Sequence, residues 1–235
     1  MRAKLILVIS ILFANGLFVY SQKMTDSCTV TFIANEGFLI GTTNHKVLID
    51  ALFGNIKGNW CDQPGDSVSR LMTSGIIPFD NINIVLVSHC HSDHFNAPMT
   101  IDFLRNNKKS VLICPDQVNE RLKLTARCSE VSEQIIAIRS HEHPDTSFIV
   151  NGISIRAMRL KHGSWIETDS ATGKSVDLHE GVDIISENRG TKNIILMHIE
   201  PARREYYKTH VKDIPGFFVF REQMEQKVII KQDDE

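Results

Sequence analysis

Apolar and polar segments alternate along the chain in a way that predicts strands and helices in turn. Short apolar runs rich in β-branched residues are typical of buried strands. They predict strands at residues 28–33, 37–41, 45–49, 82–87, 110–114, 135–138, 148–150, 153–160, 193–197 and 217–220. Longer stretches with apolar residues at helical spacing predict helices at residues 66–73, 96–107, 117–126 and 202–211. This alternation favours an α/β fold in which helices pack on a sheet.

The first 21 residues have the pattern of a secretory signal peptide. Arg2 and Lys4 give a basic start, residues 5–17 are mostly apolar, and Ser21 offers a small residue at the cleavage point. A retained membrane anchor is the alternative, but the apolar stretch is short and interrupted by polar residues, which disfavours a spanning helix. We therefore expect a signal peptide at residues 1–21 and a secreted or periplasmic protein with no stable membrane span after cleavage.

Residues 22–235 have the length and composition of a single α/β domain. Hydrophobic residues make up 42% of the chain, which is enough to build a core. The formal net charge is −2 and there is no basic stripe, so a nucleic acid is not an expected partner. The chain has five cysteines, and an odd number leaves at least one free thiol even in an oxidising compartment. These features leave the oligomeric state open.

The strongest chemical feature is the loop that follows the strand predicted at 82–87. Within six residues this loop contains four metal-ligand residues, His89, His91, Asp93 and His94. Imidazole nitrogens suit zinc, and a carboxylate can join them around a second ion. His89 and His91 can bind one ion. Asp93 and His94 can bind another, and two ions about 3.5–4 Å apart can share a hydroxide. The alternative is a histidine-rich surface loop, which four such residues at these offsets disfavour.

Other residues of ligand type are better explained by structural roles. Cys90 lies between His89 and His91, and its alternate position points it away from their ion. Packing is therefore favoured for Cys90 over a metal or redox role. His141 and His143 repeat the HxH spacing, but the proline and polar residues around them predict an exposed turn. No acid–histidine pair completes a site there, so we interpret them as surface residues.

Residues 89–94, His-Cys-His-Ser-Asp-His, resemble the HxHxDH signature of the metallo-β-lactamase superfamily. The resemblance implies an αββα sandwich with metals at one edge and the activity of a zinc-dependent hydrolase. It also implies a role for Asp50, which follows an apolar run at 47–49. In the family an aspartate at this place braces the metal loop rather than binding metal. An ordinary turn aspartate is the alternative for Asp50.

The resemblance implies two further ligands later in the chain. His162 ends a predicted strand and precedes a glycine, as the family's third histidine does, and would give a three-histidine site with an open fourth position. His198 follows the strand predicted at 193–197, as the family's last histidine does. A surface position at a strand end is the alternative for each. The implied ligands are His89, His91 and His162 for one ion, and Asp93, His94 and His198 for the other.

The chain departs from the family between these two late histidines. The family places a further aspartate there, which ends a strand and bridges both metals. Only 35 residues separate His162 from His198, and none of Asp169, Asp177 and Asp183 ends an apolar strand. We therefore expect the second half of the sandwich to be abbreviated. Without a bridging carboxylate the repulsion between two dications is less offset, so the three-histidine site should fill first.

Together these features predict an exported zinc-dependent hydrolase with one or two zinc ions and a small-molecule substrate. Zinc would lower the pKa of a bound water toward neutrality, and the metal-bound hydroxide would attack an ester, lactone, amide or phosphoester bond. Asp93 is the candidate catalytic residue, because it could orient this hydroxide or accept a proton. The alternative is a non-catalytic relative that binds a metal or a partner and lost its activity with the bridging aspartate.

Protein isolated from its native host should begin near Gln22 or Lys23, because signal peptidase cleaves after a small residue such as Ser21. N-terminal sequencing or an intact mass measurement checks this expectation. Mature protein that still carries Met1 or Arg2 would show that the segment is retained.

Overall fold

The computed structural model describes residues 27–58, 60–139, 145–158, 194–195, 209, 217–220 and 222–230. The strands are β1 (Ser27–Ala34), β2 (Gly37–Gly41), β3 (Lys46–Ile49), β4 (Ile84–Leu86), β5 (Val111–Pro115), β6 (Ile135–Ile138), β7 (Asp145–Val150), β8 (Ile153–Met158), β9 (Ile194–Ile195), β10 (Phe217–Phe218) and β11 (Gln226–Ile230). The helices are α2 (Asp66–Thr73), α3 (Ala97–Asn106) and α4 (Asp116–Lys123), followed by 3₁₀ turns at Cys128–Glu130 and Ser132–Gln134.

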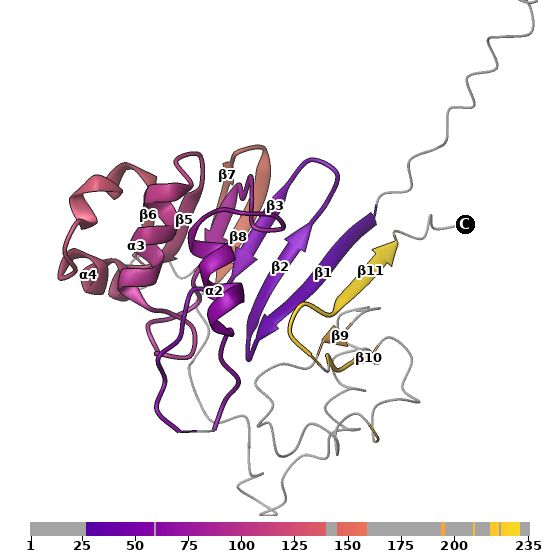
Figure 1. The fold of residues 1–235 in the computed structure, drawn as a ribbon. Coiled ribbons are helices and arrows are strands. Elements are labelled where there is room, and N and C mark those ends of the chain that lie inside the picture. The colour runs from indigo at the N-terminus through magenta and orange to yellow at the C-terminus, as the bar shows by residue number, and fades with distance from the viewer. Residues whose placement is uncertain are drawn as a thin grey trace, which may run out of the picture.

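Seven of the strands form one mixed sheet in the order β11-β1-β2-β3-β4-β5-β6 (Figure 1). Neighbours from β11 to β3 are antiparallel, whereas β3 to β6 run parallel. Parallel neighbours need crossover connections, and α2, α3 and α4 supply them in turn. Such crossovers are right-handed, so the three helices fall on one face of the sheet. There α2 contacts α3 and α3 contacts α4, and β7 and β8 form a separate hairpin.

The main hydrophobic core lies between the helical layer and the sheet. Its fully buried side chains include Leu48 and Leu112 from strands, and Met72, Phe103 and Leu104 from helices. Burial of each such side chain stabilises the fold by about 1.5–3 kcal/mol. The core packs against both β3 and β4, the two strands that precede Asp50 and the histidine loop.

The opposite face of the sheet carries a smaller aromatic cluster. Side chains alternate between the faces of a strand, so Ile33 joins the main core while Phe32 points to the other side. Phe32 stacks on Phe220 with ring centroids 5.6 Å apart, and Phe38 lies against both rings. Both faces of the sheet are therefore covered at β1 and β2, as a layered sandwich requires.

The sequence pattern places most of these elements within a few residues of their observed bounds. The strand at 217–220 is the last one that the sequence pattern predicts, but the structure has a further strand, β11, which pairs antiparallel with β1. In β11 an apolar side chain is more exposed than its charged neighbour, the reverse of what is usual in a strand. Val228 is 55% exposed, whereas Lys227 is half-buried. Apart from residue 209, the helix predicted at 202–211 lies outside the described residues.

Polar contacts fix the register between β3 and β4. Lys46 N–H donates to Asn83 Oδ1 (2.8 Å), and Asn83 N–H donates to Lys46 O (2.9 Å). The Lys46 ammonium group donates to the carbonyl oxygens of Pro78 (2.9 Å) and Asp80 (3.1 Å) and pairs with Asp80 Oδ1 at 2.6 Å. The hydrogen bond from Lys46 is the main cause that lowers the pKa of Asp80. The loop before β4 is thereby tied to the start of β3.

Replacing Asp80 by Asn should lower the free energy of unfolding by about 0.5–1 kcal/mol near neutral pH, because the ion pair is only partly buried. The folded-state pKa of Asp80 lies below its unfolded value of about 4, so the carboxylate stabilises the fold above that value. This stabilisation is lost as the pH falls through the folded-state pKa. Urea unfolding of wild type and D80N at successively lower pH measures it. Glu133→Gln, which removes an exposed charge, is the control. A difference that does not shrink in acid would contradict the assignment.

Candidate metal centre

Three chain segments meet at the edge of the sheet where β1, β3 and β4 end. β3 and β4 are parallel, so the loops that leave them start side by side. Asp50 N–H donates to Leu86 O (2.9 Å), and Asn96 N–H donates to Leu52 O (2.8 Å). β2 runs antiparallel to β1 and β3, so the β1–β2 turn at residues 35–36 reaches the same edge. Ligand sites of α/β folds usually lie outside the carboxyl ends of such strands.

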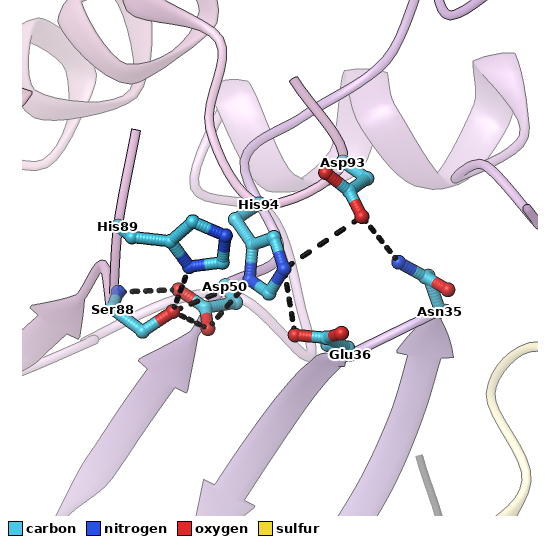
Figure 2. A network of polar contacts seen from close by, with 7 residues as sticks. All are labelled: Asn35, Glu36, Asp50, Ser88, His89, Asp93 and His94. Atoms are coloured by element: carbon cyan, nitrogen blue, oxygen red, sulfur yellow. Dashed lines mark hydrogen bonds and ion pairs between the residues drawn. The ribbon is translucent and has the colours of Figure 1, made fainter. Parts of the chain in front are cut away.

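Asp50 joins the loops that follow β3 and β4. One carboxylate oxygen accepts the Ser88 backbone N–H (2.7 Å), and the other accepts the Ser88 hydroxyl (2.6 Å) and lies 3.0 Å from His94 Nδ1. The histidine loop therefore uses both oxygens of this buried group (Figure 2). The geometry matches the bracing role that the family resemblance implies. A carboxylate on Nδ1 also makes Nε2 the nitrogen that can bind a metal ion.

His94 lies among three carboxylates. Its ring is buried, with Nδ1 against Asp50, and its Nε2 lies 2.7 Å from Glu36 Oε2 and 3.7 Å from Asp93 Oδ2 (Figure 2). Burial lowers the pKa of His94. The hydrogen bond to Asp50 and the negative charges of Asp50, Glu36 and Asp93 outweigh burial, so the pKa is raised overall. The site therefore favours a positive charge at or beside this ring.

Glu36 is a part of the site that the sequence analysis does not identify. It lies in the β1–β2 turn, where a glutamate is normally exposed, yet only 7% of its surface is accessible. The neighbouring residues fix the turn. Asn35 adopts a left-handed φ of 47°, and a Cβ on Gly37 would lie 3.0 Å from Ala51 Cα. The turn thus packs closely against the segment after β3 and directs Glu36 toward His94.

The other two histidines of the loop lie beside His94. The ring centroid of His89 is 3.8 Å from that of His94 and 4.5 Å from that of His91. Ser88 Oγ lies 3.0 Å from His89 Nδ1. His89 is half-buried and His91 is exposed, whereas Asp93 and His94 are buried. The cluster therefore opens to solvent on the side of His89 and His91.

The structure brings together four of the six predicted ligands: His89, His91, Asp93 and His94. The two others, His162 and His198, lie outside the described residues and stay predictions. The same holds for the remaining histidines and aspartates weighed above, which are His141, His143, Asp169, Asp177 and Asp183.

Among the described residues, donor atoms of Glu36, Asp50 and His94 all lie within 4.8 Å of one another. Asp50 and Glu36 contact opposite nitrogens of the His94 ring, and Asp50 also accepts two hydrogen bonds from Ser88. Asp50 is therefore the brace, and the metal-facing atoms lie on the Nε2 side. Imidazole nitrogens and carboxylate oxygens are suitable ligands for a divalent transition metal, so the residues present fit such an ion.

Two of the five free thiols lie near the site in packing roles. Cys90 is half-buried against the main core, with its Sγ 4.0 Å from Gln117 Oε1, in agreement with the packing role expected for it. Cys61 is buried, and this burial together with the negative charges of Asp93 and Glu36 raises the pKa of its thiol to about 11. A thiol with that pKa stays protonated near neutral pH and is a poor nucleophile.

A mixed sheet with helices on one face, and a histidine-rich loop where its central strands end, is the arrangement expected of a metallo-β-lactamase fold. The family model of the beta-lactamase superfamily domain matches residues 45–184, more than half of the chain. The chain therefore belongs to the beta-lactamase superfamily. The predictions of family and fold are confirmed, and this fold implies a divalent metal.

Solved structures of metallo-hydrolases share the fold. Igni18, a metallo hydrolase from the hyperthermophilic archaeon Ignicoccus hospitalis, aligns over 88% of this chain and 100% of its own, with 11% identity and a TM-score of 0.50. A possible metal-dependent hydrolase from Veillonella parvula aligns over 85% of this chain and 98% of its own, with 14% identity and a TM-score of 0.51. At these identities the likeness shows the fold alone.

A third structure, a candidate metal-dependent hydrolase from Parabacteroides distasonis, aligns with 17% identity and a TM-score of 0.29. That alignment spans 41% of this chain and about a third (34%) of the other protein's length. No curated protein matches the chain.

Replacing Asp50 by Asn should weaken the binding of a divalent metal, probed with Zn²⁺, by about 10–100-fold, because an amide can accept only through one atom and cannot hold both Ser88 and His94 as the carboxylate does. Titration of metal-free protein with Zn²⁺ against a chelator of known affinity measures this loss. D80N, which changes an aspartate at the other end of β4, serves as the matched control. Equal zinc affinity of D50N and wild type would show that the brace does not orient the metal-binding loop.

Proposed function

We propose that this protein is an exported zinc-dependent hydrolase that acts on a small molecule. The observation that carries the proposal is the loop at 89–94 in a beta-lactamase-superfamily fold, gathered where β3 and β4 end and braced by Asp50. Three of its four ligand residues are histidines, and imidazole-rich donor sets favour zinc over the hard cations Mg²⁺ and Ca²⁺.

In this proposal the side chains on the solvent-facing side of the loop would hold one ion, and those on the buried side would hold the other. His89 and His91, with His162, would hold the first. Asp93 and His94, with His198, would hold the second. Bound zinc supplies a Lewis acid that polarises the target bond and acidifies water at neutral pH. His89 is half-buried and His91 is exposed, which supports the approach of a substrate from the solvent-facing side of the loop.

Asp93 is the proposed catalytic residue. Its carboxylate is buried, accepts a hydrogen bond from Asn35 Nδ2 (3.4 Å) and lies 3.7 Å from His94 Nε2. These contacts hold the group at one place beside the histidine cluster. From there it can orient an attacking water and take up its proton. Asp50 contributes indirectly, because it sets the direction in which the His94 ring faces.

The proposed substrate contains an ester, lactone, amide or phosphoester bond, since all of these respond to polarisation of an oxygen next to the attacked atom. The second candidate function is that of a non-catalytic relative that binds metal or a partner. The observation that favours it is that no aspartate in the sequence between His162 and His198 follows an apolar run of the kind that predicts a strand. The same fold supports many different activities in other proteins, so the fold alone does not distinguish between the two candidate functions.

Export is proposed from the pattern of residues 1–21, a basic start followed by an apolar stretch and a small residue at the cleavage point. In the part of the chain that the structure describes, no helix is long and apolar enough to cross a membrane.

Purified protein should contain zinc, and changing His89 and His91 together to Ala should remove the ion that both residues are proposed to bind. Elemental analysis after dialysis measures the zinc content. His45→Ala, at the start of β3 and therefore at the opposite edge of the sheet, is the control and should retain the zinc. Undiminished zinc in the double variant would refute the assignment of the site.

Hydrolysis should be detectable in a panel of chromogenic lactam, lactone, carboxylic ester and phosphoester substrates. The H89A/H91A double variant and chelator-treated wild type should lose this activity, and added zinc should restore it only to the wild type. A fully zinc-loaded wild type that hydrolyses none of these bonds would favour the non-catalytic alternative.

A further inference from the structure

We propose that Glu36 is a ligand of the second metal ion and completes that site together with Asp93 and His94. This inference rests on the proposed metal centre and extends it to a residue outside the HxHxDH loop. It supplies a carboxylate from the β1–β2 turn to a site for which the sequence offers no bridging aspartate.

The first observation is the burial of Glu36. Glutamates in turns between strands are usually exposed, and a buried carboxylate is costly unless a cation or hydrogen-bond donors compensate it. Glu36 is 7% exposed, and its Oε2 lies 2.7 Å from His94 Nε2. The fold therefore holds a negative charge in the interior of the site rather than in solvent.

The second observation is the direction of the contact. Asp50 already occupies the Nδ1 side of His94, at 3.0 Å, so the ring can bind an ion only through Nε2. Glu36 Oε2 and Asp93 Oδ2 are the carboxylate atoms that lie near this nitrogen, at 2.7 Å and 3.7 Å. An ion bound by His94 Nε2 and Asp93 would therefore lie within reach of Glu36.

The third observation is the balance of charge. The carboxylates of Glu36, Asp50 and Asp93 all lie around one imidazole ring, that of His94. A divalent cation beside Nε2 would offset the negative charge that these three groups bring together. The attraction between a cation and these carboxylates is strong in a site shielded from water, because electrostatic interactions are stronger there than in solvent.

The turn that carries Glu36 is also built against the metal loop. Asn35 Nδ2 donates to Asp93 Oδ2 (3.4 Å), so the residue next to Glu36 already contacts a proposed ligand. Gly37, on the other side, lets the backbone pack against Ala51 at a distance that a side chain would not permit. Both neighbours of Glu36 therefore limit the positions that its side chain can take, which is the preorganisation a metal ligand needs.

With Glu36 in this role, the second ion has a negatively charged ligand besides Asp93. The expectation that the three-histidine site fills first rests on the missing bridging aspartate. A carboxylate from Glu36 would supply part of that missing negative charge. The wild-type protein should then bind two zinc ions, and the variant Glu36→Gln should bind one.

Calorimetric titration of metal-free wild type and E36Q with Zn²⁺ tests the proposal. Gln keeps the size of the side chain and its hydrogen bonding but removes the charge. The expected result is two ions in wild type and, in E36Q, a first site of unchanged affinity with a second site weakened by at least about 10–100-fold, the loss that even outer-shell changes cause. The visible absorption spectrum of the Co²⁺-loaded proteins gives a second readout, in which E36Q should lack the signal of the second ion. Glu133→Gln is the control for loss of an exposed charge.

Glu36→Asp keeps the charge on a shorter side chain and should retain partial second-site binding, which separates loss of a ligand from general damage to the turn. If E36Q binds two ions as tightly as wild type, or if wild type binds one ion that E36Q retains, Glu36 is not a ligand while the proposed zinc site stands. If wild type binds no zinc, the proposed metal centre and this inference both fall.

Discussion

The carboxylate of Asp50 is the contact on which the arrangement of the site depends. Parallel pairing of β3 and β4 brings two loops to the same edge of the sheet, but pairing alone does not fix their side chains. Asp50 belongs to one loop and accepts hydrogen bonds from Ser88, in the other, through both of its oxygens. A buried carboxylate is tolerated only when its lone pairs are satisfied in this way. Rigidity of the histidine loop and the orientation of His94 follow from that single requirement.

Around this brace the acidic side chains and the His94 ring interact with one another as one cluster of charged groups. Three carboxylates reach the His94 ring from three segments, the β1–β2 turn, the loop after β3 and the histidine loop. The three carboxylates come from segments that follow β1, β3 and β4, and β2 lies between β1 and β3 in the sheet. A single pair of neighbouring strands could therefore not bring all three together. The antiparallel half of the sheet thus contributes an acidic residue, and the parallel half contributes the histidines. Both halves of this mixed sheet are needed for the chemistry proposed.

The sequence predicts the α/β fold and the histidine loop, because each is encoded by residues close together in the chain, whereas the brace is implied by the family resemblance. The loop at 89–94 is contiguous, and Asp50 directly follows its strand. Glu36 could not be predicted in this way, because a glutamate between two strands gives no local sign that it is buried. The glycine that follows it is the one hint of close packing. β11 was missed for a related reason: its half-buried Lys227 and exposed Val228 follow from pairing with a distant strand, not from local pattern.

The pairing of β11 with β1 has a consequence for how the chain reaches its folded state. Gln226 Nε2 donates to Thr31 Oγ1 (3.2 Å), a contact between residues 195 positions apart. Contacts of such long range form slowly, because a large loop must close before they are made. Until the last residues of the chain arrive, β1 is an open edge with unpaired backbone groups, and an open edge can pair with another molecule. In the folded protein β11 covers this edge of β1, so the pairing also protects β1 from association with another molecule.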